Sequence, residues 1–252
     1  PEETKTLSFK LVESSLKRPA TSPRLEIVNG NGLQVDYAPI TPRRWAMKKV
    51  NPAKISLDGN LDDWSEANRL DSFMVGPNGD KDASRFYFGW CEKGLLIAYE
   101  VDDSNCFTAD PRSFWRATDC LEVQLTTPAG VKFKENAPWS VYDHQFWFCA
   151  MKDEKRVYPG FWGNCKEQKI LHDVKDIKNA LKTTARGYAA EIFIPAERLE
   201  GWNRAKVGGE MALSFTLAVQ GHIKERELYW PSSKREQSMK KPWTWARVKL
   251  ED

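Results

Sequence analysis

The sequence has few of the residues from which most catalytic and metal sites are built. Among 252 residues there are only three histidines, and no HExxH motif, GxSxG motif or glycine-rich phosphate loop occurs. The five cysteines never stand in CxxC spacing, which argues against a zinc or iron–sulfur site. Their odd number argues against a dedicated disulfide scaffold, although one or two disulfide bonds stay open.

Long apolar runs and blocks of one charge are also missing. No stretch of about eighteen apolar residues occurs, so we expect no membrane-spanning helix. The 38 Lys+Arg and 35 Asp+Glu residues are interspersed and give a net charge of +3. This mixture predicts a solvated surface and no nucleic-acid partner. No secretory signal is visible, and the oligomeric state is left open.

Tryptophan, in contrast, is abundant. The chain has eleven tryptophans within an ordinary hydrophobic content of 41%. The core of one domain of this size accounts for about half of them. We therefore expect several on the surface or in a cleft.

Residues 1–49 differ in texture from the rest. Residues 1–23 are polar and rich in Pro, Ser and Thr, which predicts an arm or linker. Two short apolar runs then flank Asn29-Gly30-Asn31-Gly32, a pattern typical of a β-hairpin. A proline-containing connector follows, and residues 50–252 are expected to form the main domain.

From residue 85 onward, short strand-like segments alternate with turn formers. This pattern, without a ten-residue amphipathic helix, predicts an all-β fold: an antiparallel two-sheet β-sandwich of immunoglobulin-like or jelly-roll-like type. Asp173–Leu181 has a helix-like pattern, and Pro195–Leu199 is expected to form one helical turn. The expected strands are Arg85–Trp90, Leu95–Val101, Asp119–Leu125, Gln145–Ala150, Tyr188–Ile194, Met211–Val219, Glu227–Trp230 and Trp245–Leu250.

The spacing of Asp58, Asn60 and Asp62 is similar to the start of a calcium loop. The twelfth position of such a loop would be Arg69 in place of Glu, so the segment is not an EF-hand. We favour a turn in which these side chains bond to the backbone. A structural calcium ion held by the three residues is kept as the alternative, and no cofactor is required.

The segment from Phe107 to Leu125 combines a loop tryptophan with an alternating strand. Leu121, Val123 and Leu125 are expected to face the core, so Glu122 faces the opposite side, a few residues after Trp115. A flat apolar ring beside a hydrogen-bond acceptor is suited to a sugar, which has apolar C–H faces and a polar rim. The alternatives are a buried loop anchor for Trp115 and a cross-strand ion pair for Glu122.

The same alternation in HQFWFCA places Gln145, Trp147 and Cys149 on one face, with Phe146 and Phe148 in the core. If this strand is a neighbour of the strand carrying Glu122, Cys149 and Cys120 should lie close together.

Five motifs in order resemble family 9 carbohydrate-binding modules, which occur attached to xylanases and other extracellular polysaccharide enzymes. The motifs are ISLDGNLDDW, WCEKGLLIAYEVDD, WRATDCLEVQL, GYAAEIFIP and the closing WARVKL. The resemblance covers about residues 50–252. It implies a sandwich that binds oligo- or polysaccharide without cleaving it, in a secreted, cell-surface or periplasmic protein, as part of a larger carbohydrate-active chain.

The resemblance also implies site residues. The family holds a sugar end between two tryptophans, with an acid, an amide and an arginine at its hydroxyls. The first tryptophan is similar in position to Trp115, the acid to Glu122 and the amide to Gln145. The arginine position carries Trp147, which would add a stacking surface, and the nearest candidate for the second tryptophan is Trp243.

Three alternatives remain. The domain could be a scaffold or interaction domain that has lost sugar binding. A glycoside hydrolase would need two carboxylates across one bond. The strand-embedded acids in a suitable setting are Glu122 and Glu191, and the sequence alone does not pair them. A haem-binding sandwich would use a methionine and a histidine as ligands. Its candidate ligands are Met74 or Met151 with His144 or His222.

Overall fold

The chain divides into two compact units, Pro1–Ile40 and Thr41–Asp252. The computed structural model describes residues 25–28, 34–37, 44–70, 74–75, 84–103, 110–113, 119–131, 139–162, 170–220, 225–231 and 242–252. In the first unit, β1 (Leu25–Val28) pairs antiparallel with β2 (Gln34–Tyr37). This confirms the hairpin that the Asn-Gly pattern predicts.

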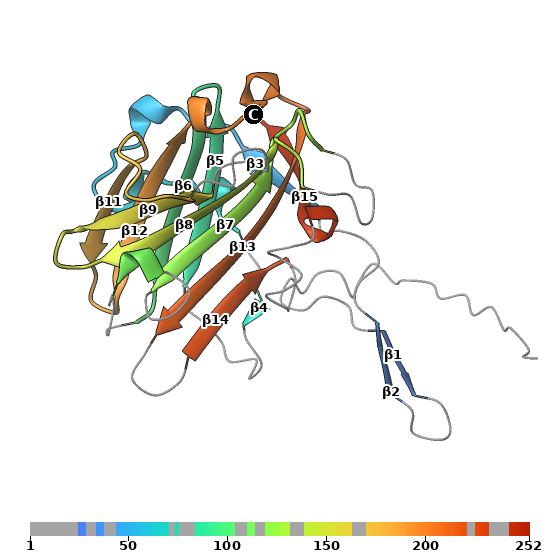
Figure 1. Cartoon of the computed structure of the whole chain (residues 1–252), viewed down its shortest axis with the longest axis horizontal. Coiled ribbons are helices and arrows are strands. Elements are labelled where there is room, and N and C mark those ends of the chain that lie inside the picture. Colours follow the sequence, from blue (N-terminus) through green and yellow to red (C-terminus); the bar gives the residue numbers. More distant parts are fainter. Residues whose placement is uncertain are drawn as a thin grey trace, which may run out of the picture. The chain divides into compact units, whose positions relative to one another are not determined.

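The second unit contains two sheets (Figure 1). The large sheet has nine strands in the order β10-β9-β8-β7-β13-β14-β4, with β15 paired to β13 and β3 paired to β15. Its strands are β3 (Arg44–Lys48), β4 (Met74–Val75), β7 (Cys120–Thr126), β8 (Asp143–Met151), β9 (Arg156–Trp162), β10 (Ile170–Leu171), β13 (Glu210–Gln220), β14 (Glu225–Trp230) and β15 (Ala246–Glu251). All its pairings are antiparallel except β3 with β15, which is parallel.

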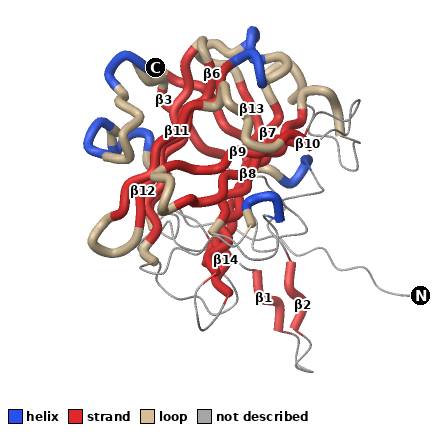
Figure 2. The backbone as a smooth tube through the Cα atoms, turned by 60° about the vertical axis from the view of Figure 1, so that its left-hand side comes forward, coloured by secondary structure: helices blue, strands red, loops and turns tan. Residues whose placement is uncertain are grey.

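The small sheet has four antiparallel strands in the order β11-β12-β6-β5. They are β5 (Arg85–Cys91), β6 (Gly94–Val101), β11 (Lys178–Thr183) and β12 (Tyr188–Pro195). The helical structure among the described residues consists of three-residue 3-10 turns, which lie in the connections between strands (Figure 2). They are η2 (Pro52–Lys54), η3 (Leu61–Asp63), η4 (Glu66–Asn68), η5 (Pro111–Ser113), η6 (Ala196–Arg198), η7 (Trp202–Arg204) and η8 (Pro242–Thr244).

The core lies between the two sheets because successive residues of a strand point to opposite faces. Phe86 of the small sheet and Phe215 of the large sheet have ring centroids 4.5 Å apart. Phe146 packs on Phe161 at 4.7 Å within the large sheet. These contacts belong to one buried cluster that draws on both sheets. Together with the pairings they confirm the predicted antiparallel β-sandwich.

The outer face of the small sheet is covered by residues 50–70. Trp64 packs there with Tyr87, Leu96 and Ala98 in a second buried cluster. Glu191 of β12 also points to this face, where its carboxylate accepts hydrogen bonds from the indole Nε1 of Trp64 (2.9 Å) and from two backbone N–H groups. Those groups belong to Asp58 (3.0 Å) and Gly59 (2.8 Å). The ISLDGNLDDW segment is therefore a cover held in place by a buried acid.

The Asp58 turn has the backbone bonds expected of an Asx turn. The Asp58 side chain accepts from the Asn60 backbone N–H at 2.8 Å, and the Asn60 amide donates to Asp62 at 3.1 Å. Within the described residues, no group of three or more His, Cys, Asp or Glu side chains could hold a metal ion. Calcium binding by Asp58, Asn60 and Asp62 stays a prediction.

Several elements differ from the sequence expectations. The helix-like segment Asp173–Leu181 is not a helix, since β11 begins at Lys178. The strand β3 lies within the segment assigned to the N-terminal arm, and it pairs with β15 along five residues. The helical turn expected after Pro195 is confirmed as η6.

Candidate functional site

The outer face of the large sheet carries an unusually polar set of side chains for a buried surface. The core-facing residues of β7 and β8 alternate with outward ones, and the outward ones are all buried. They are Cys120, Glu122, Gln124 and Thr126 on β7, and Asp143, Gln145, Trp147 and Cys149 on β8. These positions confirm which side chains of each strand were predicted to face away from the core. The pairing of β7 with β8 confirms that the two strands are neighbours.

The outward pairs of β7 and β8 sit at the closely spaced positions of the ladder. The Ala150 N–H donates to the Asp119 carbonyl at 2.8 Å, and the Thr127 N–H donates to the Tyr142 carbonyl at 3.0 Å. Between these two rungs the pairs alternate, so the outward-pointing ones are the non-hydrogen-bonded pairs, with Cα atoms about 4.5 Å apart. Across one such pair the Thr126 hydroxyl donates to Asp143 Oδ1 at 2.6 Å.

Glu122 and Gln145 meet on this face. The Gln145 amide Nε2 donates to Glu122 Oε2 at 3.4 Å, a long hydrogen bond between residues on neighbouring strands. Glu122 is 1% exposed and Gln145 is 6% exposed. Thr216 of β13 stands opposite Glu122 on the other side of β7. The acid and the amide that the sequence singles out are thus brought together.

Trp147 stands opposite Glu122, but its ring is not open to solvent. It has 0% exposed surface, and its indole lies over Gly160 of β9, where an added Cβ would be 1.8 Å from the ring. The His172 ring makes an edge contact with it at 5.9 Å. A buried ring cannot stack on a sugar without rearrangement, so a stacking role for Trp147 stays a prediction that this packing disfavours.

Gln124 is a site candidate that the sequence analysis missed. It stands opposite Gln145 on one side and Ser214 on the other, and it is fully buried. Neither atom of its amide has a hydrogen-bond partner among the described residues. A buried amide left unpaired costs about 1–3 kcal/mol, so such a group calls for an explanation. Gln124 could have been predicted from the sequence, because it lies two residues after Glu122 in an alternating strand and so shares its face.

Trp162 is a second missed candidate, at the edge of the same face. It pairs with Gln145 across β8 and β9 and is 41% exposed. Its partner on β10, Ile170, is 39% exposed. An exposed indole is thus in register with Gln145, Gln124 and Ser214, a set of four that we call the polar row. No sequence pattern indicated it, because Pro159 and Gly160 interrupt the alternation of this strand.

Of the two loop tryptophans proposed from the sequence, Trp115 and Trp243, the structure describes only Trp243. Trp115 lies outside the described residues. Trp243 is half-buried in η8, which leads directly into β15. The first residue of β15, Ala246, stands opposite Leu213, the neighbour of Ser214. Trp243 therefore lies just before β15, the strand next to the Ser214 end of the polar row. Trp162 is at the opposite end of the row.

Glu122 and Glu191, the two acids considered for a glycoside hydrolase, do not form a pair. Glu122 lies on the outer face of the large sheet, and Glu191 lies on the outer face of the small sheet. The core between stacked sheets alone is about 10 Å thick, so two acids on its far sides cannot flank one glycosidic bond. Burial raises the pKa of Glu191, while its three hydrogen bonds oppose that rise.

His144, a candidate haem ligand, points into the core. Its ring stacks with Phe146 at 6.3 Å and with Phe161 at 6.1 Å. Burial lowers the pKa of His144 to about 4, and the backbone of Glu200 opposes this shift. The other candidate histidine, His222, lies outside the described residues. Haem ligation by Met74 or Met151 with these histidines stays a prediction.

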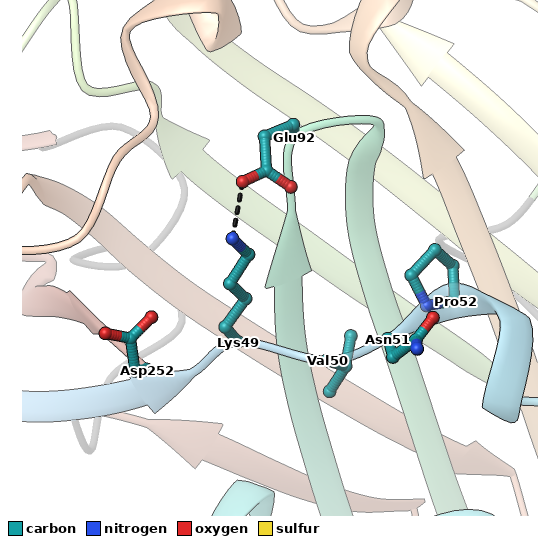
Figure 3. A pocket seen from close by; sticks show the side chains of 6 residues that line it. All are labelled: Lys49, Val50, Asn51, Pro52, Glu92 and Asp252. Atoms are coloured by element: carbon teal, nitrogen blue, oxygen red, sulfur yellow. Dashed lines mark ion pairs between the residues drawn. The ribbon is translucent and has the colours of Figure 1, made fainter.

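A separate surface cavity of about 460 Å³ lies where β3 ends and the β5–β6 hairpin turns (Figure 3). Two of its lining residues, Lys49 and Glu92, form a 2.5 Å ion pair. The pKa of Lys49 is raised by its bond to Glu92. The ammonium group also lies over the ring of Trp90, which is fully buried. The cavity is lined by Lys49, Val50, Asn51, Pro52, Glu92 and Asp252. None of the outward-pointing residues of β7 and β8 is among them.

No helix in the described parts of the chain has the length and apolar character to cross a membrane. No protein-family model matches the sequence, and no curated protein matches it either.

Solved structures, in contrast, do match. One is a family 9 carbohydrate-binding module from Caldicellulosiruptor kristjanssonii in complex with glucose, with a TM-score of 0.56 and 15% identity. The match covers 83% of this chain and 96% of that one. The same organism's family 9 module in complex with cellotriose gives a TM-score of 0.55 at 16% identity, covering 83% and 94%. A protein from Bacteroides uniformis ATCC 8492 gives 0.54 at 12% identity, covering 84% and 100%. The chain therefore has the β-sandwich fold of family 9 carbohydrate-binding modules.

Proposed function

We propose that this domain binds carbohydrate without cleaving it, on the outer face of the large sheet. The fold supports this, since matched modules of the same architecture were solved with glucose and with cellotriose. The motif order in residues 50–252 supports it independently. In this proposal the domain uses no cofactor, and it serves a larger secreted or cell-surface carbohydrate-active protein.

The observation that carries the proposal is the polar row with Glu122 beside it. A sugar ring is amphipathic, so its site needs an apolar platform next to hydrogen-bonding groups. Trp162 offers the exposed ring, Gln145 stands beside it on the next strand, and Glu122 accepts from Gln145. Gln124, with an amide that no described residue satisfies, is one strand further in. Because Gln124 and Glu122 are buried, the proposal requires the side chains that cover them to move when a sugar binds. Trp115 and Trp243 are the further stacking residues proposed.

The expected affinity is weak. Stacking one indole on a sugar face contributes about 1–2 kcal/mol, and a charge-assisted hydrogen bond contributes about 1.5–3 kcal/mol. Against the cost of association, such terms give dissociation constants of about a millimolar or somewhat below. Glucose and short β-linked glucose oligomers are the first ligands to test.

The experiment is calorimetric titration with a panel of oligosaccharides, using three variants. Trp162→Ala should weaken binding about tenfold, and Glu122→Gln should weaken it at least as much. Gln124→Met is the sharpest variant, because it removes an unsatisfied amide from a buried site. It should raise the free energy of unfolding by about 1 kcal/mol while it lowers sugar affinity. Unchanged affinity in all three variants would place any sugar binding elsewhere.

A second candidate function is a scaffold or interaction domain that has lost sugar binding. The observation that favours it is the near-complete burial of Glu122 and Trp147 on the face where a ligand should reach them. In that case no sugar binds at millimolar concentration, and Gln124→Met changes stability alone.

A further inference from the structure

The outer face of the large sheet also brings two thiols together. Cys120 of β7 and Cys149 of β8 are direct cross-strand partners, and their Sγ atoms are 3.6 Å apart. Both side chains are buried, and Tyr158 packs against them. Cys149 Sγ also lies 3.7 Å from the Pro111 carbonyl. The third cysteine among the described residues, Cys91, is on the small sheet and belongs to a different buried cluster.

The ladder geometry at this pair suits a covalent bond. Cys120 and Cys149 occupy a non-hydrogen-bonded pair, because the Ala150 N–H bonds to the Asp119 carbonyl in the adjacent rung. At such pairs the Cα atoms are about 4.5 Å apart and the side chains point the same way. A disulfide needs Cα atoms roughly 4.4–6.8 Å apart, so little backbone movement is required.

We propose that Cys120 and Cys149 form a cross-strand disulfide bond when the protein folds in an oxidising environment. The oxidant is a small-molecule or protein disulfide. One cysteine thiolate attacks a sulfur of the oxidant, which releases one reduced thiol and leaves a mixed disulfide. The second cysteine thiolate then attacks the mixed disulfide and releases the other reduced thiol. The two cysteines lose two protons and two electrons, and the oxidant's sulfur–sulfur bond takes up the electrons.

The bond is expected to form while the chain folds, before the two thiols are buried. Burial raises the pKa of the Cys120 thiol well above its usual value, and the nearby Cys149 and Glu122 add to this rise. Exchange requires a thiolate that the oxidant can reach, so the buried Cys120 thiol reacts slowly in the folded protein. Oxidation therefore takes place before β7 and β8 are covered. Once formed, the bond links the strand that carries Glu122 to the strand that carries Gln145. It also closes a covalent loop that contains the chain between Cys120 and Cys149.

The test uses a Cys106→Ser/Cys165→Ser background, which leaves Cys91, Cys120 and Cys149. The variant is unfolded, reduced and refolded in a buffer of reduced and oxidised glutathione, then denatured for alkylation and mass spectrometry. The expected result is a fall from three alkylated thiols to one, on Cys91, with a linked peptide pair containing Cys120 and Cys149. The matched control, Cys120→Ser in this background, should keep two alkylated thiols.

Three retained thiols, or a linked pair that includes Cys91, would overturn the proposal. The unaltered chain provides a second measurement in case the serine variants do not fold. Its refolded form should yield the same Cys120–Cys149 peptide pair, and linkage of either residue to Cys106 or Cys165 would overturn the proposal equally. Adding reductant should lower the midpoint of denaturation of the oxidised protein, and it should not shift the Cys120→Ser variant.

Discussion

At the residue scale, the buried polar groups have two kinds of role. Glu191 is satisfied by three donors from the segment that covers the small sheet, whereas Gln124 has no partner among the described residues. A satisfied buried acid supports structure, since its removal leaves several donors unpaired. An unsatisfied amide lowers stability and supports a role in binding.

Replacing Glu191 should therefore weaken the fold strongly. Glu191→Gln keeps the shape but offers one acceptor oxygen to three donors, so at least one N–H group faces an NH₂ group. We expect a loss of about 3 kcal/mol in the free energy of unfolding, measured by urea denaturation. Glu197→Gln, the same change at an exposed position, is the control and should stay within about 0.5 kcal/mol. Equal effects in the two variants would contradict the anchoring role.

His144 predicts a pH dependence of stability. Its folded pKa of about 4 lies below its unfolded value of about 6.5, so the unfolded chain binds the extra proton between these values. The stability that the protein gains from keeping His144 neutral is fully present above about pH 6.5 and is lost as the pH falls towards 4. It amounts to about 3 kcal/mol at most.

The measurement is the free energy of unfolding at several pH values between 4 and 7. His144→Phe keeps an aromatic ring packed against Phe146 and Phe161 but removes the titration, so its stability should change less over this range. A variant with the same slope as the unaltered protein would show that other groups cause the acid sensitivity.

At the element scale, the alternation of β7 and β8 could be read from the sequence, and it places Glu122, Gln145 and Trp147 on one face. The strand β9 could not be read in this way, because Pro159 and Gly160 interrupt its pattern. The environment of Trp147 could not be predicted either, because it depends on the register between β8 and β9. A tryptophan looks the same in sequence whether it faces solvent or lies over a glycine.

The contact between β8 and β9 gives a steric prediction. Gly160→Ala would place a methyl group within the ring of Trp147, so either the ring or the strand must move. We expect a loss of about 2–3 kcal/mol in the free energy of unfolding. In a Trp147→Leu background the same substitution should cost clearly less, and a double-mutant cycle measures the difference. Additive effects would show that Gly160 and Trp147 do not contact each other in solution.

At the scale of the whole molecule, sequence patterns predicted the sandwich because most of its strands are short, alternating and separated by turn formers. The exact extent of the sandwich depends on pairing between distant segments, which patterns do not reveal. β3 is such a case, since Met47 is fully buried in the core and Trp45 packs against it.

Two truncations test this boundary. A chain beginning at Thr41 should keep the melting temperature of the second unit, because it retains all of β3. A chain beginning at Val50 loses the buried Met47 and the half-buried Trp45, so its free energy of unfolding should fall by about 3–5 kcal/mol or more. Equal melting temperatures for the two truncations would show that β3 is dispensable.

The most direct test of carbohydrate binding is an NMR titration of the ¹⁵N-labelled protein with cellotriose. We predict dose-dependent shifts of the Gln145 and Gln124 side-chain NH₂ signals and of the Trp162 indole N–H signal. The Trp64 indole N–H, held by Glu191 on the opposite face, should not move. No shift at millimolar sugar, or shifts confined to the Lys49 cavity, would contradict the proposed site.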